Sequence, residues 1–192
     1  MRAKLTTLVA SAIVIASVSP ARAEDSTGEK KTIWDQPLVA PINALELVVG
    51  TGYTQGFGAL EPGVGMGNVA GPGLGADVGV GYRIDPHWAV GLVGQYQEFD
   101  ARRAASARGL TPGIAASYHI RPYTRLDPWV QLGVGYRFFW ENQEATGTNL
   151  LTHGLELAKL TIGADFRVDK NVALAPFIGA DVGLPLAQAT NN

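Results

Sequence analysis

The chain has 192 residues, of which 46% are hydrophobic, and it contains 24 glycines and no cysteine. Its formal net charge of −2 argues against a nucleic-acid partner, which would favour a basic surface. The length allows one domain of ordinary size, and the absence of cysteine excludes disulfides as a source of stability.

Residues 1–23 have the organisation of a secretory signal peptide. A positively charged start precedes an apolar run over residues 5–18, and an A-x-A cleavage sequence ends at Ala23. The apolar run is shorter than the ~20 residues that a membrane-spanning helix needs. We therefore expect cleavage after Ala23, which leaves 12 basic against 17 acidic residues and a net charge of −5.

The next segment, residues 24–43, is polar and proline-containing, and we expect it to form a periplasmic arm. From residue 44 onward, apolar and polar side chains alternate between turn residues, a pattern that is typical of strands. The pattern predicts seven strands, at residues 44–54, about 74–84, 88–99, about 110–120, 130–140, about 158–168 and 172–184.

Each predicted strand has two different faces. The strand at 130–140 presents an apolar face of Val130, Leu132, Val134, Tyr136, Phe138 and Trp140. Its other face contains glycine, glutamine and arginine. Aromatic residues are expected at the two rims of the apolar band, with Trp88, Tyr123 and Trp129 at one rim and Tyr53, Tyr96 and Trp140 at the other. This arrangement predicts a barrel with a lipid-facing outside and a polar interior.

The predicted connections alternate in length along the chain. Tight turns are expected at 85–87, 126–128 and 169–171, and longer loops at about 55–73, 100–109 and 141–157. Asn43, Asp85, Asp127 and Asp169 recur at intervals of 42 residues, which indicates a repeated hairpin unit. Short turns at one end and long loops at the other are typical of outer-membrane barrels, with the short turns in the periplasm.

On these features the chain resembles the small eight-stranded outer-membrane barrels, of the outer-membrane protein A barrel-domain and opacity-protein type. The resemblance rests on the signal peptide, on RIDPHWAVG from Arg83, on RVDKNVALAPF from Arg167, and on the GVGYR strands at 79–83 and 133–137. It covers residues 44–192 and is generic to the class. The resemblance implies no single activity, because the family includes membrane-stabilising proteins, adhesins, small pores and a few lipid-modifying enzymes.

The predicted fold class is all-β, an up-and-down antiparallel transmembrane β-barrel of nominally eight strands, seven of them visible in residues 44–192. An odd number of strands would leave two edges unpaired in lipid. We expect the eighth strand to be missing because the chain is a truncated form. The alternatives are a strand around Ile33 to Val39 and completion by a second chain.

The predicted interior contains four acidic and four basic side chains. They are Glu46, Asp77, Arg83, Arg137, Lys159, Asp165, Arg167 and Asp181. Glu46, Arg83, Asp165 and Arg167 are expected near the tight turns, and the other four about half a membrane away. Charges buried in this way must pair. The pairs are interpreted as a structural plug, and the alternative is a gate whose pairs exchange to open a narrow water path.

Other candidate sites have weaker patterns. Arg102, Arg103 and Arg108 cluster in a predicted outer loop, where they would be solvated or contact lipopolysaccharide phosphates. His87, His119 and His153 are expected far apart, and Ser106 and Ser117 have no evident His/Asp partners, so no metal, cofactor or catalytic residue is predicted.

The sequence therefore predicts a monomeric, non-enzymatic protein of the bacterial outer membrane with a structural or surface-interaction role. Its expected partners are outer-membrane lipid, lipopolysaccharide and an unidentified protein at the outer loops. A narrow ion or solute pore is the alternative function, and a lipid-modifying enzyme is the weaker third.

Overall fold

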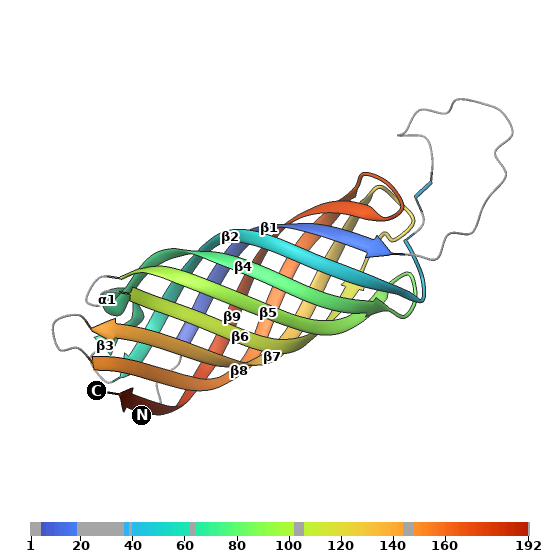
Figure 1. Ribbon diagram of the computed structural model, residues 1–192. Coiled ribbons are helices and arrows are strands. Elements are labelled where there is room, and N and C mark those ends of the chain that lie inside the picture. Colours follow the sequence, from blue (N-terminus) through green and yellow to red (C-terminus); the bar gives the residue numbers. More distant parts are fainter. Residues whose placement is uncertain are drawn as a thin grey trace, which may run out of the picture.

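The computed structural model describes residues 5–18, 37–38, 40–61, 64–101, 106–143 and 148–191. It is an antiparallel β-structure in which each long strand pairs with the next along the chain, and the sheet curls around a common axis (Figure 1). The seven predicted strands are β2 (Ala44–Glu61), β4 (Ala70–Arg83), β5 (Trp88–Ala101), β6 (Ser106–His119), β7 (Leu126–Gln143), β8 (Thr148–Arg167) and β9 (Val172–Asn191). The predicted all-β, up-and-down antiparallel arrangement is confirmed.

A further strand, β1 (Leu5–Val18), lies between the first and the last of these strands. It pairs antiparallel with β2 along one edge and with β9 along the other, so the circle of strand pairings is closed. These residues form the apolar run of the predicted signal peptide, and their pairing as a strand was not predicted. Of the alternative stretch at 33–39, only Pro37 and Leu38 are described, and neither belongs to a strand.

The strands extend further than the alternation predicted, so the predicted loops at 55–73, 100–109 and 141–157 are wrong in their bounds. The first of these loops is instead the end of β2, the short strand β3 (Val64–Gly65), helix α1 (Met66–Val69) and the start of β4. Within the described ranges, no helix is long and apolar enough to cross a membrane. We call the end of the barrel that contains β3 and α1 the loop end, and the opposite end the turn end.

The two faces of the strands differ as predicted. Large apolar side chains lie outside, for example Val49 at 62%, Leu92 at 66% and Leu132 at 59% exposure. Many polar and charged side chains, by contrast, are buried inside. Trp129 is an exception to the predicted outer girdle, because it lies inside at 6% exposure and packs against Phe177. Trp129 is two residues from Gln131 on β7, so both side chains point to the inner face of the strand.

Two of the turns are built in the same way, which accounts for part of the 42-residue spacing. Asp85 Oδ1 accepts hydrogen bonds from the backbone N–H groups of His87 and Trp88, and Asp169 Oδ1 accepts them from Asn171 and Val172. Both are aspartate-capped turns of four residues. The connection between β6 and β7 is two residues longer, and Asp127 lies inside β7 instead of capping the turn.

Close strand contacts require glycine at position 91. A Cβ atom at Gly91 would lie 2.5 Å from the Val80 carbonyl oxygen and 2.7 Å from Gly81 Cα, both of them backbone atoms that cannot rotate away. At Gly75, by contrast, the nearest atom would be 3.6 Å away, an ordinary contact.

We expect Gly91→Ala to lower the free energy of unfolding by about 1–3 kcal/mol, because the added methyl group forces β4 and β5 apart. Denaturant unfolding of the folded protein measures this change. The matched control, Gly75→Ala, should remain within about 0.5 kcal/mol of the parent chain. Equal effects of the two substitutions would contradict the described register.

Candidate functional site

The interior of the barrel contains two networks of charged and polar side chains. The lower network, near the turn end, consists of Glu46, Arg83, His119, Asp127, Trp129, Asp165 and Arg167. The upper network, toward the loop end, consists of Asp77, Gln95, Thr111, Arg137, Glu156, Lys159 and Asp181. All eight charged residues singled out in the sequence belong to one or the other, and they divide between the two levels as expected.

Asp127 is the centre of the lower network. Its side chain is fully buried, and its Oδ2 accepts hydrogen bonds from Arg167 Nη2 at 2.6 Å and from His119 Nδ1 at 2.9 Å. Its Oδ1 accepts a third hydrogen bond, from the backbone N–H of Arg121. The carboxylate therefore ties β6, β7 and β8 together at the turn end.

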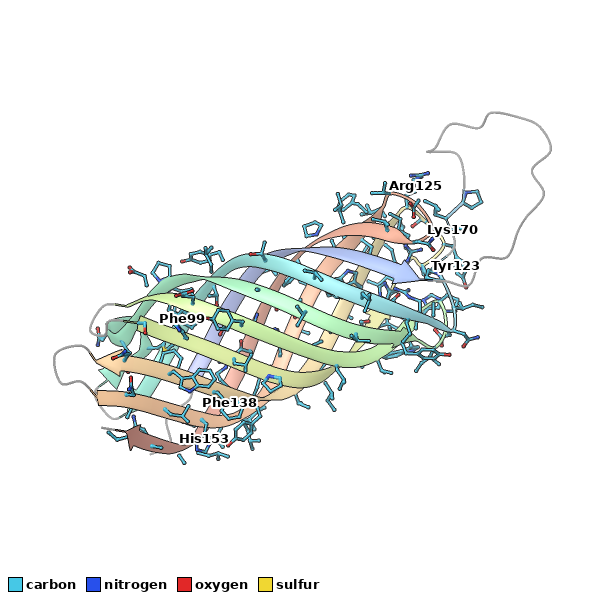
Figure 2. All side chains as sticks on the ribbon, in the orientation of Figure 1. Phe99, Tyr123, Arg125, Phe138, His153 and Lys170 are labelled. Atoms are coloured by element: carbon cyan, nitrogen blue, oxygen red, sulfur yellow. The ribbon has the colours of Figure 1, made fainter. Side chains whose placement is uncertain are left out.

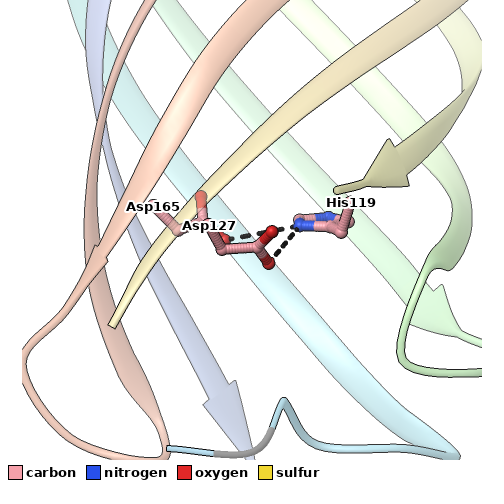
Figure 3. Close-up of side chains that lie close together, drawn as sticks. All are labelled: His119, Asp127 and Asp165. Carbon is pink, nitrogen blue, oxygen red and sulfur yellow. Dashed lines mark hydrogen bonds and ion pairs between the residues drawn. The ribbon is translucent and has the colours of Figure 1, made fainter. Parts of the chain in front are cut away.

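His119 faces the carboxylates of Asp127 and Asp165 (Figure 3), and its other ring nitrogen faces a guanidinium group. Its Nδ1 faces Asp127 at 2.9 Å and Asp165 at 3.8 Å, and its Nε2 lies 3.0 Å from Arg83 Nη2. Arginine only donates hydrogen bonds, so Nε2 must accept and Nδ1 carries the proton in this arrangement. The other ends of the network are also satisfied, since Arg83 pairs with Glu46 and Trp129 Nε1 donates to Asp165 at 2.8 Å.

The three residues His119, Asp127 and Asp165 offer ligand atoms within 4.8 Å of one another, close enough to hold a metal ion. These atoms already have partners: Arg167 binds Asp127, and His119 Nδ1 donates its proton to the same carboxylate. A divalent cation here would have to displace the Arg167 guanidinium group and the Nδ1 proton. The donor set therefore fits an internal hydrogen-bonded plug better than a metal centre.

The same contacts limit acid–base chemistry at this position. Ser117 and His119 line one cavity, and Asp127 orients the imidazole, as in a nucleophilic triad. His119 Nε2, the atom that would take the serine proton, faces Arg83 instead. The arrangement lacks a free base, although it has the right residue types.

The arm that precedes β2 closes the turn end of the barrel. Arg167 Nη1 donates to the carbonyl oxygens of Leu38 at 3.2 Å and of Pro122 at 2.6 Å, and the Ala40 N–H donates to Pro122 at 2.9 Å. Pro122 is fully buried. Arg167 thus links the arm, the β6–β7 turn and the lower network.

In the upper network one arginine serves two carboxylates. Arg137 Nη2 lies 2.7 Å from Glu156 Oε2 and 2.8 Å from Asp181 Oδ1, and all three side chains are buried. The third ion pair of the upper network is looser, since Lys159 Nζ and Asp77 Oδ1 are 3.8 Å apart. Gln95 also donates to Asp77, at 3.0 Å.

Three titratable members of the networks, Glu156, Asp127 and His119, were not among the predicted interior residues. Glu156 was assigned to a loop, and a register shift between Glu156 and Ala158 changes the phase of β8, so that Glu156 is buried. Asp127 was assigned to a turn. His119 was expected to be remote from His87, which is wrong: His87 Nδ1 lies 2.7 Å from the His119 carbonyl oxygen. Ser117 and His119 alternate along β6 with the exposed Tyr118 and Ile120. This alternation is the signal in the sequence that could have placed His119 inside.

A cavity of about 100 Å³ separates the two networks. Its walls include Asp77 and Lys159 from above and Glu46, Ser117 and His119 from below. The volume is sufficient for a few water molecules, and the walls provide polar partners for them.

An apolar cluster fills the loop end of the barrel. Helix α1 supplies Met66 and Val69, which are buried with Ala70, Phe99, Ala107 and Phe139. Phe99 and Phe139 meet edge to face, with ring centroids 5.9 Å apart. The residues predicted to form an outer loop at 55–73 therefore include a plug for this mouth.

The predicted arginine cluster is described only in part, since Arg102 and Arg103 lie outside the described residues. Arg108 is on β6 and not in a loop, which corrects its predicted position. It is exposed and lies 3.9 Å from Glu98, also exposed. A surface groove nearby, of about 460 Å³, includes Tyr96, Arg108 and Trp140 in its walls.

Comparison with known proteins returned no matching family model, no matching curated protein and no matching solved structure.

We expect Arg167→Met to lower the free energy of unfolding by about 3–5 kcal/mol, because it leaves the buried Asp127 carboxylate without its guanidinium partner. Denaturant unfolding measures the loss. Arg121→Met, at an exposed position in the adjacent turn, is the control and should change little. The double variant Arg167→Met/Asp127→Asn should recover part of the loss, and a double variant worse than the sum of the two single ones would contradict the pairing.

Proposed function

We propose that this protein is a β-barrel of the bacterial outer membrane with a structural or surface-interaction role and a closed interior. The proposal includes export by residues 1–23 and their removal after Ala23. One observation carries it: the hydrophobicity of the strands is reversed relative to a water-soluble barrel, with apolar side chains outside and ion pairs inside.

The outer surface supports a lipid environment. Large apolar side chains are exposed around the sheet, among them Leu47 on β2, Leu92 on β5, Leu132 on β7 and Ile162 on β8. Soluble monomers rarely expose a continuous apolar surface of this kind. In lipid the same surface is favourable, and in the full chain the closed strand pairing satisfies the backbone groups that lipid cannot.

Aromatic side chains mark the edges of the apolar band. Trp88 and Tyr118 meet near the turn end with ring centroids 5.0 Å apart, close to His87. Toward the loop end, Phe138 and Trp140 stack at 5.9 Å on the outer face, with His153 beside Phe138 (Figure 2). Aromatic girdles of this kind are typical of the two membrane–water interfaces. Tyr123, Arg125 and Lys170 lie beyond the band, at the turn end.

The packing of the interior favours a structural role over the conduction of ions or solutes. Along its axis stand the lower network, the cavity, the upper network and the apolar cluster around Phe99. Three of these four layers are closely packed groups with direct contacts. Buried arginines with two or more polar partners hold the layers in place.

A narrow pore is the second candidate function, and one observation favours it. The Lys159–Asp77 pair is longer than the other interior pairs that involve lysine or arginine, and both side chains border the cavity. If a water path opens through the interior, the Lys159–Asp77 ion pair is the one that separates most easily.

The resemblance to small eight-stranded outer-membrane barrels agrees with this proposal. The expected contact with lipopolysaccharide rests on Arg108 among the described residues, beside the aromatic groove at the loop end. In the proposed membrane orientation, this groove would face the polar part of the outer leaflet. Phosphates and sugars of that leaflet, or a protein ligand, are the proposed partners.

We expect Leu132→Arg to destabilise insertion into lipid vesicles by about 2–4 kcal/mol, because residue 132 faces outward near mid-strand. Unheated and boiled electrophoresis after refolding into vesicles reports the folded fraction. Leu132→Met keeps an apolar side chain at the same position and should insert like the parent chain. A parent chain that stays soluble without detergent would contradict the membrane assignment itself.

We expect the parent barrel to pass no steady current in planar bilayers, and Arg137→Ala to leave it closed. The reason is that the layers act in series, so removal of one cation leaves the lower network and the apolar cluster intact. Protease protection in vesicles confirms insertion of each sample. Steady current through the parent chain that changes in Arg137→Ala would favour the pore.

A further inference from the structure

The cavity between the two networks contains polar atoms that the packing of the barrel leaves unsatisfied. Two buried atoms on its walls, Asp77 Oδ2 and Thr161 Oγ1, have no hydrogen-bond partner among the described residues. We propose that this cavity is a binding site for a small neutral molecule with adjacent hydroxyl groups, about the size of ethylene glycol. The site belongs to the barrel of the full chain, and it requires neither a membrane nor the removal of residues 1–23.

Thr161 is the strongest indication of a ligand. Its side chain is buried, at 3% exposure, and it forms part of the cavity wall. The neighbouring residue on β9 is Gly179, where a Cβ atom would lie only 3.0 Å from Thr161 Oγ1, so this neighbour has no side chain that could bond the hydroxyl group. A buried hydroxyl group without a partner is costly, and a bound molecule that supplies the missing hydrogen bond stabilises the barrel.

Thr161 also belongs to a row of uncharged polar side chains across three adjacent strands. Ser117 on β6 is the register partner of Gln131 on β7, and Gln131 is the register partner of Thr161 on β8. All three line the cavity. Because neighbouring strands lie about 4.8 Å apart, the row presents two hydroxyl groups and an amide group at intervals that adjacent hydroxyl groups of one small molecule can bridge.

The charges on the wall favour a neutral ligand over an ion. Each carboxylate that borders the cavity already faces a basic partner: Glu46 faces Arg83, Asp77 faces Lys159 and Glu156 faces Arg137. An ion would bring a charge that no group of the wall compensates, which is unfavourable in a closed interior. A hydroxyl group can instead donate to Asp77 Oδ2 and accept a hydrogen bond from another group, with no change in charge.

The part of the wall formed by β2, β4 and β5 consists largely of small apolar residues. It includes Val48, Gly79, Gly91 and Val93. This side accommodates C–H groups, whereas the row that contains Thr161 accommodates hydroxyl groups. A water molecule has no apolar side to match the first wall. A small diol matches both, because its carbon atoms and its oxygen atoms can face opposite ways.

The volume of the cavity limits the size of the ligand. An apolar cavity of ~150 Å³ accommodates benzene. At about 100 Å³ the present cavity suits a smaller molecule, such as ethylene glycol, and a disaccharide is too large. The lower network lies on one side of the cavity, and the upper network and the apolar cluster lie on the other. A ligand is therefore enclosed, so the probe must be present while the barrel folds.

The test uses the full chain, labelled with nitrogen-15 and refolded in detergent micelles at a series of ethylene glycol concentrations. The side-chain amide signal of Gln131, assigned by its absence in Gln131→Met, reports occupancy of the cavity. We expect a saturable change of this signal with half-saturation at roughly 10–100 mM. Sucrose is the control for general solvent effects, and it should cause no saturable change.

Two variants locate the site. Thr161→Val removes the hydroxyl group at nearly constant size, and it should raise the half-saturation concentration roughly fivefold to tenfold. Its matched control, Thr51→Val, makes the same replacement on the exposed outer face of β2 and should leave the titration unchanged. Ala115→Leu fills the cavity from its wall and should abolish the saturable change.

Three results overturn the inference. They are a response of the parent chain that does not saturate, which means that the cavity holds water only, saturation by sucrose as well, and equal titrations of Thr161→Val and Thr51→Val. If Ala115→Leu does not fold, the comparison of the two valine variants decides. The same titration in plain buffer applies to a chain that folds without detergent, so the result is independent of the membrane assignment.

Discussion

The constraint on which this structure depends is the antiparallel ladder wound around a narrow axis. A pleated strand sends alternate side chains to opposite faces, so a small closed ladder gives half of the strand residues an interior too tight for free solvent. Every charge on that face needs a partner within the barrel. The interior networks and the glycines at close contacts, such as Gly91, follow from this requirement.

Arginine is well suited to such an interior because one guanidinium group satisfies several acceptors. Arg137 serves Glu156 and Asp181, and Arg167 serves Asp127 and two backbone carbonyl groups. Among the described residues, buried carboxylates outnumber buried arginines: Glu46, Asp127, Glu141, Glu156, Asp165 and Asp181 against Arg83, Arg137 and Arg167. Sharing of each cation is therefore a necessity of composition, and it binds neighbouring strands more firmly than isolated pairs would.

The ends of the barrel are closed by different means, although they belong to the same ladder. At the turn end, polar backbone of the arm and of the β6–β7 turn is held by Arg167. At the loop end, Met66 and Val69 turn inward onto Phe99 and Phe139. Between β2 and β9 the ladder is closed by Leu5–Val18, a segment without a charged residue.

The sequence by itself determined the strand class, the approximate positions of the seven strands and the face on which most of their side chains lie. These are local properties, since a period of two is read from neighbouring residues, and the same parity assigned Arg83, Arg137 and Asp181 to the interior. What only the tertiary structure decided depends on register between strands far apart in the chain. The bulge that buries Glu156, the role of Asp127 as a network centre, the contact of His87 with His119 and the inward Trp129 are of this kind. The position of Leu5–Val18 is also of this kind. Its pairing depends on both neighbouring strands, and one of them, β9, lies at the other end of the sequence.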